Sequence, residues 1–153
     1  MTVQSPFFIR AARVDDAAEI ARLNTELGYP STAEKVATRL SALLARPDHF
    51  VAVAAASEAH LLGWIAAEHR FLLHYDARAE LIGLVVGSDA KRRGIGRTLV
   101  RTAEDWAAAR GLTEIFVRSS VARSESHPFY ESLGYRRNKT QHSYAKMLGE
   151  ESH

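Results

Sequence analysis

The segment from residue 79 to residue 119 constrains the fold more than any other part of the sequence. It opens with AELIGLVV, an apolar run of strand length, and passes through a basic turn into a helical pattern with Ile95, Leu99 and Ala103 on one stripe. Gly111 ends that pattern, and TEIFVRS then has the composition of a strand. A strand, a helix and a second strand in this order predict a crossover connection within one sheet.

The remaining segments predict further strands and helices around this unit. Ser31 and Glu34 have the spacing of a capping box and indicate where the second helix begins. Strands are expected at 7–13, 49–56, 60–70 and 142–148, and helices at 15–28, 31–49 and 127–135, with a hairpin turn near 57–59. The sequence therefore predicts a single α/β (α+β) domain over residues 1–153, with a mixed, mostly antiparallel sheet of six or seven strands and four helices.

Composition excludes several classes of protein and site. The chain has no cysteine, which excludes disulfides, thiolate metal sites and a cysteine nucleophile. Its seven histidines lack the spacing of metal ligands, so no metal is expected. The apolar run Val51–Ala56 is too short for a bilayer, which requires roughly 20 residues. No secretory signal is visible, so we expect a cytoplasmic protein that does not bind a membrane.

The turn before the long helix is the strongest candidate for a ligand site. The first amides of a helix have no partner within the helix and carry partial positive charge, and glycines allow a ligand to approach the backbone closely. Cations at this end oppose the helix dipole, so their presence favours an anionic ligand such as a pyrophosphate over a solvated run of charge. The predicted site comprises Lys91, Arg92, Arg93, Gly94, Ile95, Gly96 and Arg97.

Two common nucleotide motifs do not fit this turn. A Walker loop needs four residues between its glycines and a following Gly-Lys-Ser/Thr, which is absent. The dinucleotide fingerprint needs a third glycine where the chain has Leu99, and its acidic residue on the next strand is also missing.

The segment Ala79–Leu148 resembles the GNAT superfamily of acetyl-CoA-dependent N-acetyltransferases. KRRGIG is similar to the family's pyrophosphate loop, Arg/Gln-x-x-Gly-x-Gly/Ala, with Lys91 where arginine or glutamine is usual. HPFYESLGY is similar to the family's second motif, a short helix that ends in Leu-Gly-Tyr/Phe. The resemblance implies a GNAT-like sheet that splays between its fourth and fifth strands, with acetyl-CoA as co-substrate and a primary amine of a small molecule or protein as acceptor.

The fourth strand carries the expected thioester site and one candidate for the general base. Gly83 within this strand indicates a bulge. The resemblance implies that free backbone groups at Leu84, Val85 and Val86 pair with the pantetheine arm, and that the amide of Leu84 or Val85 polarises the thioester carbonyl. In simple alternation Glu80 shares a face with Ile82 and Leu84, where partial burial would make it a better proton acceptor near neutral pH.

Alternatives to this base remain open at this point. Glu80 could instead lie at the solvated start of the strand, and Glu68 and His69 on the neighbouring strand are then the candidates, acting directly or through water. Without cysteine, direct attack of the amine in a ternary complex is the expected chemistry.

The resemblance assigns two further residues near the C-terminal motif. Tyr130 is the candidate acid that protonates the departing thiolate and would also contact the cofactor; the alternative is a tyrosine that only packs with Phe129 and Leu133. Ser120 stands where many relatives have an asparagine that binds the cofactor, and its shorter side chain can still donate a hydrogen bond.

The sequence also leads to expectations about the acceptor pocket, the oligomeric state and competing functions. The acceptor pocket is expected between residues 24–32 and 69–78, with Tyr29, Phe71, Tyr75, Asp76 and Glu26 as candidate lining. The resemblance allows a homodimer, with the last strand as a contact, and leaves the oligomeric state open. The alternatives are a catalytically silent acetyl-CoA sensor and a nucleic-acid binder; the second is disfavoured because no other basic patch or interleaved aromatic residues accompany the loop.

Overall fold

The computed structural model describes residues 6–90, 93–118 and 126–149 and forms two compact units, Met1–Arg118 and Ser119–His153. The first unit contains the sheet and most of the helices. Its elements are β1 (Phe8–Ala11), η1 (Val14–Asp16), α1 (Ala17–Glu26), α2 (Ala33–Leu44), β2 (His49–Ser57), β3 (His60–Arg70), β4 (Arg78–Val86), η2 (Ser88–Ala90), α3 (Ile95–Ala109) and β5 (Ile115–Val117). The single domain expected from the sequence stays a prediction.

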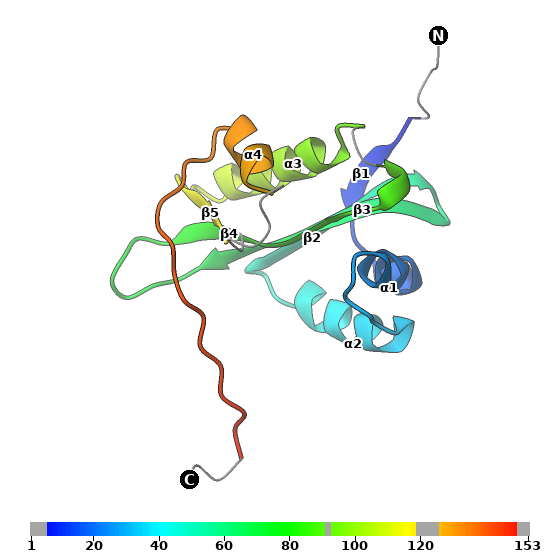
Figure 1. Ribbon diagram of the computed structural model, residues 1–153, viewed down its shortest axis with the longest axis horizontal. Helices are drawn as coiled ribbons and strands as arrows, with labels where there is room; N and C mark the ends of the chain where they lie inside the picture. Colours follow the sequence, from blue (N-terminus) through cyan, green and yellow to red (C-terminus); the bar gives the residue numbers. More distant parts are fainter. Residues whose placement is uncertain (1–5, 91–92, 119–125, 150–153) are drawn as a thin grey trace. The chain divides into compact units, whose positions relative to one another are not determined.

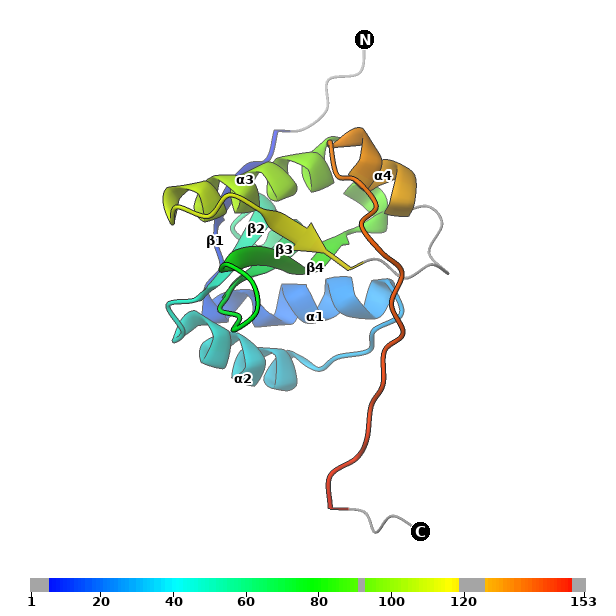
Figure 2. The ribbon, with the colours of Figure 1, turned by 90° about the vertical axis from the view of Figure 1, so that its left-hand side faces the viewer.

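The sheet of the first unit has five strands in the order β1-β2-β3-β4-β5. The strands β1 to β4 are antiparallel neighbours, and β5 runs parallel to β4 after the crossover through α3. Helices α1 and α2 cover one face of the sheet and α3 covers the other (Figures 1 and 2). The mixed, mostly antiparallel sheet, the crossover and the hairpin between β2 and β3 are therefore as predicted.

The core between the sheet and helices α1 and α2 follows from the two periodicities of the sequence. On β2 the alternate residues Val51, Val53 and Ala55 are buried in this core, and on α1 Ile20 and Leu23 are buried against them. Burying one such aliphatic side chain contributes about 1.5–3 kcal/mol. None of the described helices has a stretch that is long and apolar enough to span a bilayer.

A buried ion pair fixes β1 to the start of α1. The Arg10 guanidinium donates two hydrogen bonds to Asp16, at 2.8 and 2.7 Å, and the Arg13 amide donates a third at 2.8 Å. Burial opposes ionisation of Asp16, but these donors outweigh it and hold the pKa of that carboxyl below its ordinary value. Asp16 therefore stays ionised, as a buried partner of arginine must.

Two sequence expectations about the fold are wrong. Residues 142–148 form no strand, and the described sheet has five strands rather than six or seven. An extended segment becomes a strand only when a neighbour takes up its main-chain hydrogen bonds, and no described strand pairs with this one. The helix α2 is capped by Thr32 rather than Ser31, since the Thr32 hydroxyl accepts the Lys35 amide at 3.1 Å.

The second unit is built around α4 (Ser126–Ser132) and the turn that ends it. Gly134 adopts a left-handed conformation with φ 94°, and the Tyr135 amide donates to the Tyr130 carbonyl at 3.1 Å. The rings of Tyr130 and Tyr135 then meet edge-on with centroids 5.8 Å apart. The Leu-Gly-Tyr pattern therefore has a structural reason: its glycine ends the helix, and its tyrosine contacts the ring of Tyr130.

Candidate active site

The strand β4 has a bulge at the predicted glycine. Ala66 of β3 pairs with Gly83 and the next residue, Ala67, pairs with Leu81, so Ile82 is the extra residue. The bulge shifts the alternation, and the simple pattern expected from the sequence is therefore wrong beyond Leu81. Because Gly83 and Glu80 lie opposite Ala66 and Glu68, they share a face, while Leu84 lies on the other face.

An aromatic side chain packs directly on the bulge. A methyl group added at Gly83 would lie 2.7 Å from two ring carbons of Trp64, so only glycine fits beneath that ring. The Trp64 indole donates to the Asn24 side chain of α1 at 2.9 Å. Ile82, at the bulge itself, remains 45% exposed. The bulge is thus held from one side by α1 and leaves an apolar side chain at the surface.

Beyond the bulge, one edge of β4 has no strand partner among the described residues. The strand β5 pairs with β4 only from Ala79 to Leu81, and no other described strand continues the ladder on that side. The Gly87 amide donates to the Leu62 carbonyl of β3 at 2.8 Å. Since main-chain groups alternate in direction along a strand, Val85 also faces β3, whereas the main chain of Leu84 and Val86 faces the open side.

The N-terminal turn of α3 lies close to the end of this strand. A methyl group added at Gly63 would lie 3.4 Å from both Leu99 of α3 and the Val86 backbone, which places the two elements together. Gly94 caps the helix in a left-handed conformation with φ 77°. The Gly94 carbonyl accepts the amide and the hydroxyl of Thr98.

The predicted loop residues divide by exposure. Arg97 and Gly94 are exposed, Arg93 and Gly96 are half-buried, and the Ile95 side chain is buried in the core. Ile95 can therefore meet a ligand only through its main chain. Lys91 and Arg92 lie outside the described residues.

Glu26 connects α1 to the turn that leads into this loop. Its carboxylate accepts hydrogen bonds from both the amide and the hydroxyl of Ser88, with the amide at 2.6 Å. The bonds from Ser88 lower the pKa of Glu26 below its ordinary value. Glu26 was expected to line the acceptor pocket; its contact with Ser88, far away in the chain, could not be predicted from the sequence.

Glu80 lies in the sheet with both carboxylate oxygens engaged. The residue is 7% exposed, Arg70 Nη1 lies 2.8 Å from Oε2, and Arg118 Nε lies 3.0 Å from Oε1. The alternative expectation, that Glu80 lies at the solvated start of the strand, is therefore wrong. Both oxygens of this candidate base already have a guanidinium partner.

The other candidate bases lie on β3, beside the same strand. Glu68 is half-buried and pairs directly with Glu80 in the ladder. His69 accepts a hydrogen bond from Arg110 at its Nδ1, at 2.9 Å, and stacks on Phe71 with ring centroids 4.3 Å apart. Accepting at Nδ1 leaves Nε2 as the nitrogen through which His69 could meet a substrate.

Tyr130 belongs to the second unit, where it is half-buried and its ring contacts those of Phe129 and Tyr135. This burial raises the pKa of the Tyr130 hydroxyl above its ordinary value, so the group stays protonated at neutral pH. A proton donor must have this form. Ser120 lies outside the described residues.

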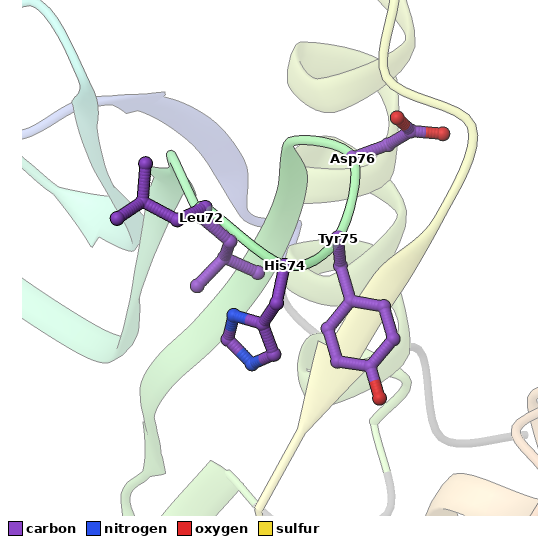
Figure 3. Close-up of a pocket in the computed structure, with 5 residues that line it drawn as sticks. Leu72, His74, Tyr75 and Asp76 are labelled. Carbon is purple, nitrogen blue, oxygen red and sulfur yellow. The ribbon is translucent and has the colours of Figure 1, made fainter.

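The two segments expected to form the acceptor pocket each border a surface depression. The loop between β3 and β4 curls around one, with the His74 and Tyr75 rings on one side of the loop and Asp76 on another (Figure 3). A second lies between α1 and the start of α2 and is lined by Ala18, Ala21, Arg22, Thr25, Glu26, Ser31 and Ala33. Within the described residues, no three histidine, aspartate or glutamate side chains gather as metal ligands.

Comparison with known proteins identifies the family. The family model described as "Acetyltransferase (GNAT) family" matches residues 14–135. Aminoglycoside N(6')-acetyltransferase type 1 of Klebsiella aerogenes is 30% identical over 134 residues, which cover 83% of this chain and 88% of that protein.

Solved structures give the same fold. The aminoglycoside 6'-N-acetyltransferase AAC(6')-Ih of Acinetobacter baumannii is 19% identical with a TM-score of 0.80, over 94% of this chain and 100% of that one. AAC(6')-Iy, solved in complex with the bisubstrate analog CoA-S-monomethyl-acetylneamine, is 18% identical with a TM-score of 0.80, over 94% and 100%.

The chain belongs to the GNAT acetyltransferase family. It is an N-acetyltransferase that uses acetyl-CoA as co-substrate and transfers the acetyl group to an amine. The relatives give no support to the alternative of a silent acetyl-CoA sensor.

Proposed function

We propose that the open edge of β4 and the N-terminal turn of α3 bind acetyl-CoA, and that a primary amine attacks the thioester directly. The observation that carries this proposal is the main chain of Leu84 and Val86, which pairs with no described strand on its outer side, beside the glycine-capped start of α3. An extended pantetheine arm can complete the ladder there, as a strand would. The diphosphate then meets the first amides of α3, which lack partners within the helix.

The basic residues of the turn assist this binding. Arg93 and Arg97, together with Lys91 and Arg92, supply charge for the phosphates, while Gly94, Ile95 and Gly96 contribute main-chain groups. Val85 contributes little directly because its main chain faces β3. Of the two amides considered for the thioester carbonyl, we therefore select Leu84, whose N–H faces the open side.

The transfer needs three proton movements. The acceptor ammonium first gives a proton to a base, for which Glu80 is our choice, with Glu68, His69 or water as alternatives. The neutral amine nitrogen then forms a bond to the thioester carbon, the carbon–sulfur bond breaks, and the thiolate takes the Tyr130 proton. The second proton that leaves the nitrogen restores Tyr130 through solvent. Ser120 is proposed to hydrogen-bond the cofactor.

The acceptor is proposed to be the primary amine of a small molecule. The names of the relatives make an aminoglycoside amine one class to test. The cytoplasmic location expected from the sequence and the homodimer that the resemblance allows stay predictions.

The experiment is a screen for acetyl-CoA-dependent release of free thiol with a panel of amines, with mass spectrometry of the acetylated product. Thiol release that depends on an amine and yields an N-acetyl product is the expected result. Tight acetyl-CoA binding without amine-dependent release for any primary amine in the panel would overturn the proposed reaction.

A further inference from the structure

Three arginines surround Glu80 on one face of the sheet. Arg70 at the end of β3 lies directly opposite Arg78 at the start of β4, and Arg118 follows β5. Glu80 pairs with Phe116 of β5, so the alternation of each strand brings Arg70, Arg78 and Arg118 to the face of Glu80. Like charges placed opposite each other in neighbouring strands are unfavourable. The pairing of the strands therefore does not by itself explain why three arginine side chains lie on this face of the sheet.

The contacts of these arginines account for only part of their charge. Arg70 and Arg118 share the single Glu80 carboxylate, at 2.8 and 3.0 Å. Arg78 has aromatic contacts, lying 3.8 Å from the centroid of the Phe116 ring and 5.6 Å from that of Tyr75. Each guanidinium has five N–H donors, and within the described residues one carboxylate does not take up all the donors of two arginines.

Among the described residues, the acidic side chains of this face do not balance the three cations. Glu68 lies opposite Glu80 on the same face, so two carboxylates accompany three guanidiniums. The Arg118 side chain is 71% exposed, that of Arg70 is 30% exposed, and that of Glu80 is 10% exposed. Arg118 is thus the most accessible of these three groups, and Glu80 is covered.

We propose that the acceptor amine also carries an acidic group, a carboxylate or a phosphate, which binds to Arg118 and Arg70. This inference rests on the proposed function, because it places the acceptor beside β4. Glu80 and Leu84 pair with Glu68 and Ile65, which are three steps apart along β3, about 10 Å at the rise of a strand. An acid separated from the amine by several bonds spans that distance. A polycationic acceptor would face repulsion from the same arginines.

The test uses matched pairs of amines. Calorimetry of the CoA-loaded protein and thiol release with acetyl-CoA are measured for 6-aminohexanoate against 6-aminohexanamide, and for glucosamine 6-phosphate against glucosamine, with neamine as the polycation. We expect the acidic member of one pair to be favoured at least about tenfold in Kd and kcat/KM. The pair that responds distinguishes a carboxylate from a phosphate.

Variants assign the effect to these side chains. Arg118→Gln and Arg70→Gln should each remove most of the preference, measured as the ratio of Kd between the acidic and the neutral member, while Arg39→Gln on the exposed face of α2 should keep that ratio and serves as the matched control. The binding ratio is compared because both arginines also contact Glu80, so turnover of both members changes with them. Glu80→Gln should strengthen binding of the acidic member, because it frees both guanidiniums. A merely structural role for the arginines would not produce these opposite changes.

The outcomes separate this inference from the proposed function. Turnover of neutral amines or neamine as good as that of the acidic members would overturn the acidic acceptor and leave the acetyl transfer intact. Preferential binding of an acidic member without thiol release would overturn the acetyl transfer and leave the acidic acceptor intact. Failure of both acidic members to bind would overturn the inference.

Discussion

The close packing of Trp64 on Gly83 leads to a testable prediction about the bulge in β4, which lies beside the Leu84 amide. A methyl group at position 83 would lie 2.7 Å from two Trp64 ring carbons. Non-bonded carbons prefer about 3.5–4.0 Å, so the overlap is on the order of 1 Å. The ring cannot simply move aside, because its indole is hydrogen-bonded to Asn24 at 2.9 Å and packs against the core. Gly83→Ala should therefore destabilise the protein by about 1–3 kcal/mol.

A double-mutant cycle tests the cause of that loss. Phenylalanine at position 64 lacks the outer ring carbons, so Gly83→Ala should cost less than about 1 kcal/mol in a Trp64→Phe background. Chemical denaturation gives the four stabilities. Gly63→Ala is the matched control: its methyl group would lie 2.6 Å from the Val85 main-chain oxygen, which Trp64→Phe cannot relieve.

The same variants report on function. Gly83→Ala should lower kcat/KM for acetyl-CoA, because displacement of the bulge moves the Leu84 amide. An equal cost of Gly83→Ala in both backgrounds would refute the reasoning, as would wild-type stability of the single variant.

Further predictions concern protons and charge. Tyr130→Phe should lower kcat on the order of 10²-fold with little change in acetyl-CoA affinity, and an unchanged kcat in rapid-mixing assays would remove the acid role. Glu80→Gln should lower kcat and flatten the loss of rate at acidic pH, whereas a wild-type pH profile would reassign the base to Glu68, His69 or water. Asp16→Asn should cost about 1–3 kcal/mol at about pH 7, because it leaves the partly buried Arg10 guanidinium without its carboxylate partner. Since the folded pKa of Asp16 is lowered, its contribution is present above the ordinary pKa of an aspartate and is lost as pH falls through the lower folded pKa, so denaturation curves of the variant and wild type should converge only in that acidic range; a difference independent of pH would contradict this.

The local features of the site could be predicted from the sequence. Gly94 was expected to let the backbone meet a ligand and has a left-handed conformation, and Gly83 was expected to mark a bulge and does so. Both expectations depend on the conformational freedom of a single residue type, which is a local property.

The long-range features could not be predicted in the same way. The loop between β3 and β4 is too long for its turn chemistry to fix the register, so the pairing of Arg70 with Arg78 was not readable. The extra residue Ile82 also moved Leu84 to the face opposite Glu80. The segment 142–148 has the alternation of a strand but no described partner, and a pattern alone does not supply one.

The most direct check on how the cofactor is held is a calorimetric titration with acetyl-CoA, in which the wild type is compared with Gly96→Glu. A carboxylate in the first turn of α3 suits the helix dipole, so folding should be retained while phosphate is repelled. We predict saturable binding by the wild type and none by the variant at equal thermal stability. Undiminished affinity of the variant would show that the diphosphate does not rest on this turn.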